Sequence, residues 1–150
     1  DLSSLIIPGK RVSIDMVDWL DDSMIIRERS FKERLSLADW NGVKGCFVAV
    51  SSSKDVIVPP WAYLLIQTKL HNIANQVFFA DLETMNTLLF KRSLENLDLS
   101  KYTNRRVFLK VCSNKILPLC AISLCAHVLM PHVKSLFYGE PCSSIPLIKN

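Results

Sequence analysis

The chain has no apolar run long enough to form a membrane-spanning helix. Its longest such run, residues 116–130, falls short of the roughly 20 residues required and contains Pro118, Ser123 and His127. The opening residues DLSSLIIPGK show neither the basic start nor the cleavage pattern of a secretory signal. Because no initiating methionine is present, we expect a segment before Asp1 to have been lost. The sequence therefore predicts no membrane partner.

Glycine is scarce, with four residues among 150, and no low-complexity tract or Gly/Ser linker divides the chain. A chain of this length can bury an ordinary hydrophobic core without the help of disulfide bonds. The sequence therefore predicts a single α/β domain over residues 1–150.

Paired cysteines are also lacking, since the five cysteines are odd in number and form no CxxC motif. This usage favours reduced thiols and a cytoplasmic location, because structural disulfides are concentrated in secreted proteins. The three histidines are not among the predicted metal ligands. Cys46, Cys120 and Cys125 lie in apolar segments and are predicted to be packing residues.

The chain has no strong excess of either charge, with 18 Lys and Arg against 14 Asp and Glu, a net charge of +4. The basic residues are mixed with acids in RERSFKER and are only mildly clustered in KYTNRRVFLK. A nucleic-acid-binding protein usually gathers positive charge on one face and adds aromatic platforms. We therefore expect no nucleic-acid partner and predict a protein partner; the pattern does not indicate the oligomeric state.

Apolar strands and helices alternate along the chain. Ser30-Phe31-Lys32-Glu33 has the S-x-x-E pattern of a capping box and predicts a helix from Ser30 to about Ala38. Strands that alternate with helices of this length favour parallel pairing. The sequence thus predicts a three-layer α/β sandwich with a mainly parallel sheet, whose strands would be residues 11–14, 46–50, 77–80, 107–111 and 136–138.

Nearly the same phrase occurs twice, as VSSSK at residues 50–54 and as VCSNK at residues 111–115. Both phrases follow a predicted strand, and aligning them matches Phe47 with Phe108. We therefore predict that residues 47–84 and 108–143 are two similar βαβ units.

Thiols and carboxylates follow the ends of several predicted strands. In an open parallel sheet the carboxyl ends of the strands lie at one edge, which is where ligands bind. Cys112, Cys142, Asp81 and Glu140 are therefore candidate ligands for a zinc or iron ion, or a pair of sulfur-handling thiols with neighbouring acids. In the alternative interpretation, Cys112 points inward, Cys142 packs under the tail and Asp81 only caps a helix.

Ser52, Asp55 and Lys115 are predicted at the same edge and are the candidates for cofactor binding, although the cofactor itself is unknown. Serine hydroxyls before a helix can bind a phosphate group. However, no glycine permits the close backbone approach of a P-loop, and Asp55 would repel an anion.

The segments IDMVDWL, DVIVPPWAYLL, FADLETM, VCSNK and FYGEPCSSIPL together resemble an uncharacterised bacterial family, domain of unknown function number 2480, typical of Bacteroidetes. The resemblance implies that relatives also have cysteine at the positions of Cys112 and Cys142, and that some have a further cysteine near Ser52. It also implies an association with the sulfur-mobilisation machinery of iron–sulfur assembly.

These observations favour an uncharacterised cytosolic protein, a non-catalytic accessory that handles metal or sulfur in iron–sulfur metabolism. One alternative is a small enzyme with a cysteine nucleophile and a carboxylate acid or base, although no histidine is placed beside a cysteine. The other is an interaction module that binds partners through helix faces. The sequence does not decide whether the protein is an enzyme.

Overall fold

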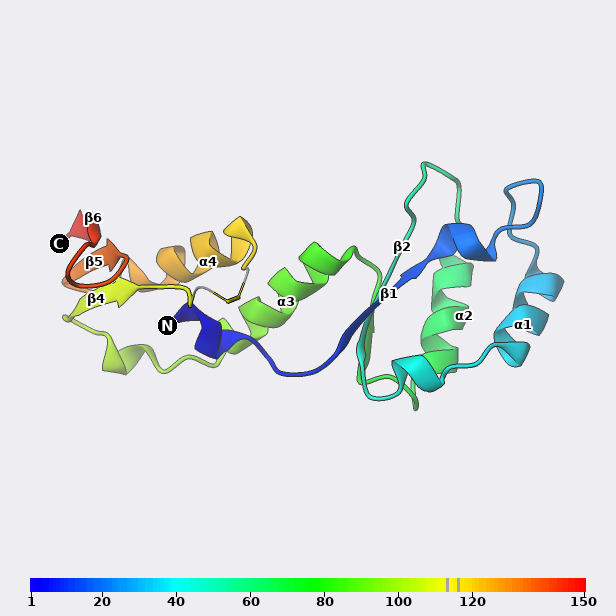
Figure 1. Cartoon of the computed structure of the whole chain (residues 1–150), viewed down its shortest axis with the longest axis horizontal. Coiled ribbons are helices and arrows are strands. Elements are labelled where there is room, and N and C mark those ends of the chain that lie inside the picture. Colours follow the sequence, from blue (N-terminus) through cyan, green and yellow to red (C-terminus); the bar gives the residue numbers. More distant parts are fainter. Residues whose placement is uncertain (113, 116) are drawn as a thin grey trace. The chain divides into compact units, whose positions relative to one another are not determined.

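The computed structural model describes residues 1–112, 114–115 and 117–150, and divides the chain into two compact units (Figure 1). Unit 1 comprises residues 1–7 and 86–150, and unit 2 comprises residues 8–85. Each unit has a three-stranded sheet of its own in the described part of the chain. The mixed α/β class is confirmed, whereas two sheets are present where the sequence predicted one, and the three-layer sandwich is not confirmed.

The sheet of unit 2 contains β1 (Arg11–Asp15), β2 (Phe47–Ser51) and β3 (Gln76–Phe78), in that order and all parallel. The central strand β2 is buried from Phe47 to Val50. A nearly continuous apolar sequence is typical of a strand that is covered on both faces, so the sequence-based assignment of this strand is confirmed.

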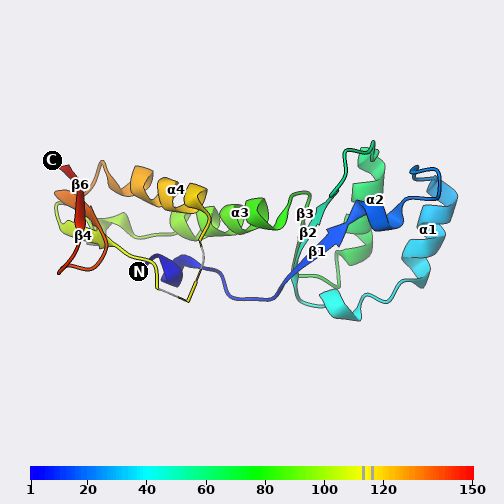
Figure 2. The same ribbon diagram turned by 45° about the horizontal axis from the view of Figure 1, so that its top comes forward.

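Two helices, α1 (Glu28–Leu37) and α2 (Pro60–Leu70), lie on the same side of this sheet (Figure 2). Pro60 occupies the first turn of α2, where its missing N–H has no intrahelical partner to lose. The core between sheet and helices contains aliphatic side chains of β2 and α2 together with aromatic residues of the preceding segments. Its fully buried members include Met16, Phe31, Val48, Val50, Ala62, Ile66 and Leu70.

The start of α1 differs from the prediction, because the helix begins at Glu28 with Arg27 as its N-cap residue. Ser30 therefore lies inside the first turn, and its hydroxyl donates to the carbonyl oxygen of Arg27 at 3.2 Å. The predicted capping box, with Ser30 as the N-cap residue, is therefore wrong, because the N-cap lies three residues earlier (30 − 27).

The sheet of unit 1 contains β4 (Arg106–Leu109), β5 (Ser135–Tyr138) and β6 (Ile145–Lys149). Strands β4 and β5 are parallel, whereas β6 pairs antiparallel with β5. The helix α3 (Leu82–Glu95) begins in unit 2 and continues into unit 1, and α4 (Leu119–Leu129) connects β4 with β5.

One face of the unit 1 sheet packs on helices. The buried cluster combines residues of α3, α4, β4 and β5, including Phe90, Leu94, Ala121, Cys125, Leu129, Leu109 and Leu136. Four short 3-10 helices complete the described elements: Leu2–Leu5, Met16–Trp19, Asn41–Val43 and Leu99–Lys101. The first of them is held beside the end of β4 by a hydrogen bond from the Leu2 N–H to the Lys110 carbonyl oxygen at 2.8 Å.

Each unit contains a strand, a helix and a second parallel strand with the same spacing. Phe47 of β2 pairs with Gln76 and Arg106 of β4 pairs with Ser135, so the partners are 29 residues apart in both units (76 − 47 and 135 − 106). The helices between them, α2 and α4, both have 11 residues. Their buried residues are Ala62, Ile66 and Leu70 in α2, and Ala121, Cys125 and Leu129 in α4.

These matches place equivalent residues 59 positions apart (106 − 47), not 61 as the VSSSK and VCSNK phrases suggest. At this spacing the position of Phe47 in its strand pair matches that of Arg106, two residues before Phe108, with which the sequence analysis had aligned it.

Candidate functional site

Cys112 lies just beyond the end of β4 and presents an exposed thiol. Its Sγ donates to Oδ2 of Asp1 at 2.7 Å, and its backbone N–H donates to the hydroxyl of Ser3 at 3.2 Å. Asp1 in turn accepts a hydrogen bond from the backbone of Ser3 at 2.9 Å, which makes it the N-cap of the first 3-10 helix. Cys112 is therefore held by two residues far away in the sequence, its thiol by Asp1 and its backbone by Ser3.

An ion pair lies beside this thiol, between Lys110 Nζ and Glu140 Oε1 at 3.0 Å. The two side chains meet because the Gly139 N–H donates to the Leu109 carbonyl oxygen at 2.8 Å, where β4 and β5 end. Hydrogen bonding to Glu140 and its charge raise the pKa of Lys110, and the neighbouring Cys112 adds to that increase. The edge thus offers a ligand one accessible sulfur, one carboxylate acceptor and one paired ammonium group.

Cys142 lies in the loop between β5 and β6 and is also exposed. Neither Cys142 nor Cys112 is in a disulfide, and among the described residues no hydrogen bond joins them. Exposure of both thiols contradicts the alternative in which they are simple packing residues. Their side-by-side placement stays a prediction.

The other three cysteines were all predicted to be packing residues, but they differ in exposure. Cys46 and Cys125 are buried, which confirms their predicted packing role, but Cys120 is exposed. Cys120 lies at the start of α4, one position before the buried Ala121, so it faces away from the helix's packed side. The prediction for Cys120 was therefore wrong.

Asp81 belongs to unit 2, whereas the other three predicted metal ligands belong to unit 1. Its Oδ1 accepts the backbone N–H of Thr84 at 2.7 Å, and this bond lowers the pKa of Asp81. Asp81 therefore caps α3, as the alternative interpretation held.

The predicted ligands do not assemble into a metal centre in the part of the chain that the structure describes. There, no group of three or more His, Cys, Asp or Glu side chains is arranged to hold a metal ion. Glu140 is paired with Lys110, and the one carboxylate that the Cys112 thiol contacts among the described residues is that of Asp1. This donor set does not fit a resident zinc or iron ion, which requires about four ligands.

The predicted cofactor-binding residues are likewise divided, with Ser52 and Asp55 in unit 2 and Lys115 in unit 1. The Ser52 hydroxyl donates to the carbonyl oxygen of Lys54 at 2.8 Å, which closes a turn in place of binding an anion. Asp55 and Lys115 are exposed.

Asp15, at the end of β1, is a residue that the sequence analysis missed. Its Oδ1 accepts the backbone N–H groups of Val17 at 3.0 Å and Ser53 at 3.1 Å, so it ties β1 to the loop after β2. Hydrogen bonding to Ser53, the largest contribution, lowers the pKa of Asp15. An acid at a strand end was the available signal, as it was for Asp81.

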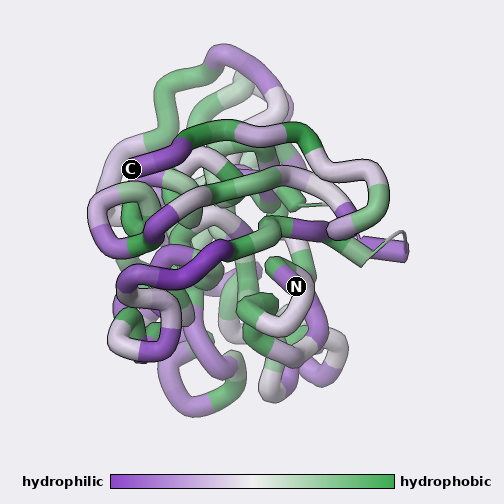
Figure 3. Tube along the Cα trace, turned by 90° about the vertical axis from the view of Figure 1, so that its left-hand side faces the viewer, coloured by the Kyte–Doolittle hydropathy of each residue, from purple (hydrophilic) through white to green (hydrophobic). Residues whose placement is uncertain are grey.

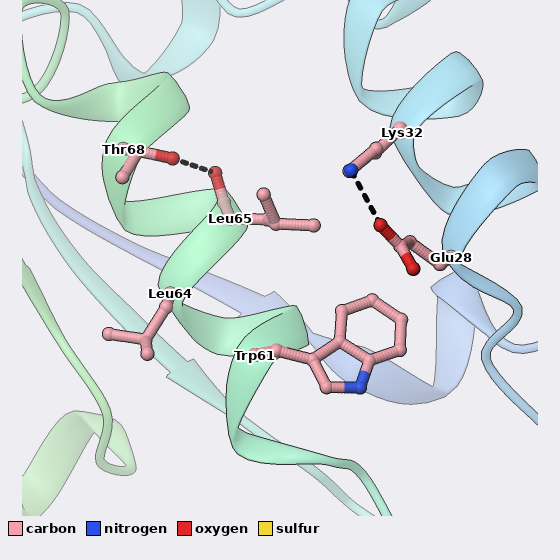
Figure 4. Close-up of a pocket in the computed structure, with 6 residues that line it drawn as sticks. All are labelled: Glu28, Lys32, Trp61, Leu64, Leu65 and Thr68. Atoms are coloured by element: carbon pink, nitrogen blue, oxygen red, sulfur yellow. Dashed lines mark hydrogen bonds and ion pairs between the residues drawn. The ribbon is translucent and has the colours of Figure 1, made fainter.

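The sequence analysis also missed a groove between α1 and α2. One hollow of about 360 Å³ has an apolar wall of Trp61 and Leu65, which point from α2 toward α1 (Figure 4). On the α1 side, Lys32 Nζ lies 2.6 Å from Glu28 Oε1. A second hollow, of about 320 Å³, shares Lys32, Leu65 and Thr68 with the first, and is further lined by Leu35, Ser36 and Lys69.

Comparison with known proteins gave one family-model match, described as "Protein of unknown function (DUF2480)", over residues 1–150. Neither the search of curated proteins nor the search of solved structures found a match. Among the described residues, no helix combines the length and hydropathy that a bilayer span requires.

Proposed function

Since the chain belongs to the family of unknown function DUF2480, we propose a function from its own residues: a non-catalytic accessory protein that takes up sulfur or a soft metal ion at Cys112. One observation carries this proposal, the exposed Cys112 sulfur 2.7 Å from the Asp1 carboxylate and beside Lys110. Thiolate sulfur is the side-chain group with the highest affinity for sulfane sulfur and soft metals.

For sulfur, the step is an exchange with a donor persulfide. The Cys112 thiolate attacks the outer sulfur of the donor, the donor's S–S bond breaks, and the donor leaves as a thiolate. The proton that Cys112 gives up, toward Asp1, ends on the donor thiolate. The products are a Cys112 persulfide and a donor thiol, so neither an oxidant nor a reductant is consumed.

For a zinc or iron ion, Cys112 and Asp1 supply two of the ligands that a stable site needs. The remaining ligands come from a partner protein, which makes the contact transient. Iron–sulfur metabolism is the setting that the family resemblance implies, and five free cysteines fit a reducing compartment such as the cytoplasm.

The test is to incubate the reduced protein with inorganic polysulfide and to map persulfides by mass spectrometry. We expect the label on Cys112, its loss in Cys112→Ser, and at least about a fivefold reduction in Asp1→Asn, whose amide is a weaker acceptor. Cys120→Ser is the matched control, because Cys120 is also exposed but lies at the start of α4. The proposal would be contradicted if all exposed thiols were labelled equally. It would also be contradicted if the total amount of persulfide were the same in Cys112→Ser as in the wild type.

A second candidate function is an interaction module, favoured by the groove between α1 and α2. Its apolar wall of Trp61 and Leu65 fits the apolar face of a helix, and Lys69 at one end fits an acidic flank. A synthetic amphipathic peptide of leucine and glutamate is the probe, followed by backbone amide shifts. Thr68→Arg should weaken binding at least about tenfold, whereas Gln67→Arg, an exposed neighbour outside the groove, should not. Equal effects of both would contradict it.

We also propose that the strand–helix–strand segments of the two units are copies of one βαβ unit. The equal spacing of paired strands and of buried helix residues supports this proposal. An experimental structure in which residues 45–80 and 104–139 fail to superpose would contradict it.

A further inference from the structure

The positive charge of the chain belongs to unit 1. Unit 1 contains 9 Lys and Arg against 4 Asp and Glu, a net charge of +5, whereas unit 2 contains 9 against 10, a net charge of −1. Together they give the +4 of the whole chain. An asymmetry of this kind indicates an anionic partner for the basic unit.

Four cationic side chains gather at one end of the unit 1 sheet. The strand register places Arg106, Ser135 and Lys149 in a row across β4, β5 and β6. Backbone hydrogen bonds of 2.9 Å, from Lys134 N–H to the Arg105 oxygen and from Asn150 N–H to the Lys134 oxygen, bring the adjoining residues together. Figure 3 shows the hydrophilic C-terminal end that follows the apolar part of β6. The four cations are Arg105, Arg106, Lys134 and Lys149.

These four side chains are exposed, and among the described residues none of them forms an ion pair with a carboxylate. The acids of unit 1 that do form ion pairs are bound to other lysines: Glu95 to Lys91, Asp98 to Lys101 and Glu140 to Lys110. The positive charge of the cluster therefore remains available to a ligand.

An aromatic pair adjoins Arg106 on the same face of the sheet. Phe108 and Phe137 stack with ring centroids 5.0 Å apart and an interplanar angle of 23°. The Arg106 guanidinium lies over both rings, 5.3 Å from the centroid of Phe108 and 4.5 Å from that of Phe137. Side chains alternate along a strand, so these residues point away from the core face that contains Leu109 and Leu136.

The fold does not require this combination, because unit 2 lacks it at the equivalent positions. At the 59-residue spacing, Arg105 and Arg106 correspond to Cys46 and Phe47, and Lys134 corresponds to Asn75. The same strand–helix–strand framework is therefore built without any of the three cations.

We propose that the outward face of the β4–β5–β6 sheet binds single-stranded nucleic acid. The four cations contact the phosphates, and an unpaired base stacks on the Phe137 and Arg106 platform. Single strands are favoured over duplexes, because only an unpaired base can present its flat face to this platform. The site lies at a different end of β4 from Cys112, so it does not depend on the thiol chemistry proposed above.

The experiment measures fluorescence anisotropy of labelled oligouridylate, oligodeoxythymidylate and a duplex of equal length, across a salt series. We expect both single strands to bind more tightly than the duplex. Four phosphate contacts predict that log K falls with log salt at a slope of about −3. Arg106→Gln with Lys149→Gln should reduce the slope to about −1.5, because two contacts are lost.

Phe137→Leu should weaken single-strand binding about tenfold and leave the slope unchanged, because it removes stacking and no charge. The matched controls belong to unit 2: Lys44→Gln replaces an exposed lysine, and Phe79→Leu replaces an exposed phenylalanine. Neither should change the affinity by more than about twofold, given their place outside the cluster. Thermal melting of every variant verifies that it is folded, and the surface change Arg106→Gln tests the site even where Phe137→Leu fails to fold.

Several outcomes would overturn the proposal. These are no binding at 50 mM salt and about 100 µM protein, equal losses in the control variants, or tighter binding to phosphatidylglycerol vesicles than to oligonucleotides. The proposal also fails if inorganic polyphosphate binds as tightly as oligouridylate and Phe137→Leu has no effect. The surface would then be a general polyanion site that does not recognise bases. None of these results bears on the function proposed for Cys112, which is tested separately by polysulfide labelling.

Discussion

At the scale of single residues, the cysteines differ most in their access to solvent. Cys112, Cys120 and Cys142 are exposed, whereas Cys46 and Cys125 are buried. Burial raises the pKa of Cys125 to about 11, because a thiolate is poorly solvated in the core. Since the thiolate is the reactive form, the two groups should react at different rates.

We predict that iodoacetamide at pH 8 modifies the three exposed thiols at least about 100-fold faster than Cys125, given the low thiolate fraction of a buried thiol. Raising the pH toward 11 should accelerate Cys125 while the fold persists, because its thiolate fraction increases. Peptide mass spectrometry over time measures each rate. Modification of Cys125 at the rate of Cys112 in the folded protein would contradict its burial.

A second prediction at this scale concerns Asp81 as the cap of α3. Asp81→Ala should lower the melting temperature by a few degrees at pH 7, because the Thr84 N–H loses its acceptor. Asp81→Asn should retain only part of this stability, because a neutral amide oxygen is a weaker acceptor than a carboxylate. The pKa of Asp81 is lowered from 3.8, so its contribution is present above that value and is lost as the pH falls through the folded-state pKa. A difference between wild type and Asp81→Ala that does not decrease as the pH falls below 3.8 would refute this explanation.

Residue chemistry was only partly predictable from the sequence. The exposure of Cys112 agrees with its prediction as a ligand-binding thiol, and the capping by Asp81 agrees with the alternative interpretation of that residue. The contacts of Cys112 with Asp1 and Ser3 were not predictable, because they join residues more than 100 positions apart in the chain. Cys125 is buried and Cys120 is exposed because one side of α4 faces the core. Most residues of α4 are apolar, so its sequence does not readily indicate which side that is.

At the scale of elements, the buried positions of the sheets determine stability. Leu136 of β5 is 0% exposed and belongs to the unit 1 core. We predict that Leu136→Ala lowers the free energy of unfolding by about 3 kcal/mol, because it removes buried methyl groups and leaves a cavity. Denaturant titration measures the loss.

Leu37→Ala is the control for that substitution, since Leu37 is 79% exposed at the end of α1. It should change the free energy of unfolding by less than about 0.5 kcal/mol. Equal losses in the two variants would show that Leu136 does not contribute to a packed core.

Most helices and strands were predicted from local sequence patterns, and those that were missed have local explanations. The apolar strand FVAV and the helix after Pro59 were predicted because burial and proline leave clear signals. β6 was taken for a tail because Pro146 interrupts it. Proline is tolerated there, since β6 pairs on one side only, with β5, in the described sheet.

At the scale of the whole molecule, the sequence predicted parallel pairs but not their grouping into two sheets. Each pair, β2 with β3 and β4 with β5, depends on one short connection, whereas the grouping depends on contacts between distant segments. Because this grouping was not predictable, the uneven distribution of charge between the two units was not predictable either. A net charge of +4 over 150 residues looks weak until residues 1–7 and 86–150 are known to form one unit with +5. The prediction of no nucleic-acid partner rested on that sum, together with the mixing of basic and acidic residues and the lack of visible aromatic platforms.

Unit 1 is built from two segments that flank residues 8–85, which constrains the order in which its contacts form during translation. Leu2 emerges early, but the Lys110 carbonyl that its N–H binds emerges late, after all of residues 8–85. A nascent chain stalled before Lys110 should therefore resist limited proteolysis in residues 8–85 while its first residues stay cleavable. The Asp1 carboxylate can meet the Cys112 thiol only after residues 8–85 and the segment up to Cys112 have been synthesised, so a nascent chain that stops before Cys112 lacks this contact.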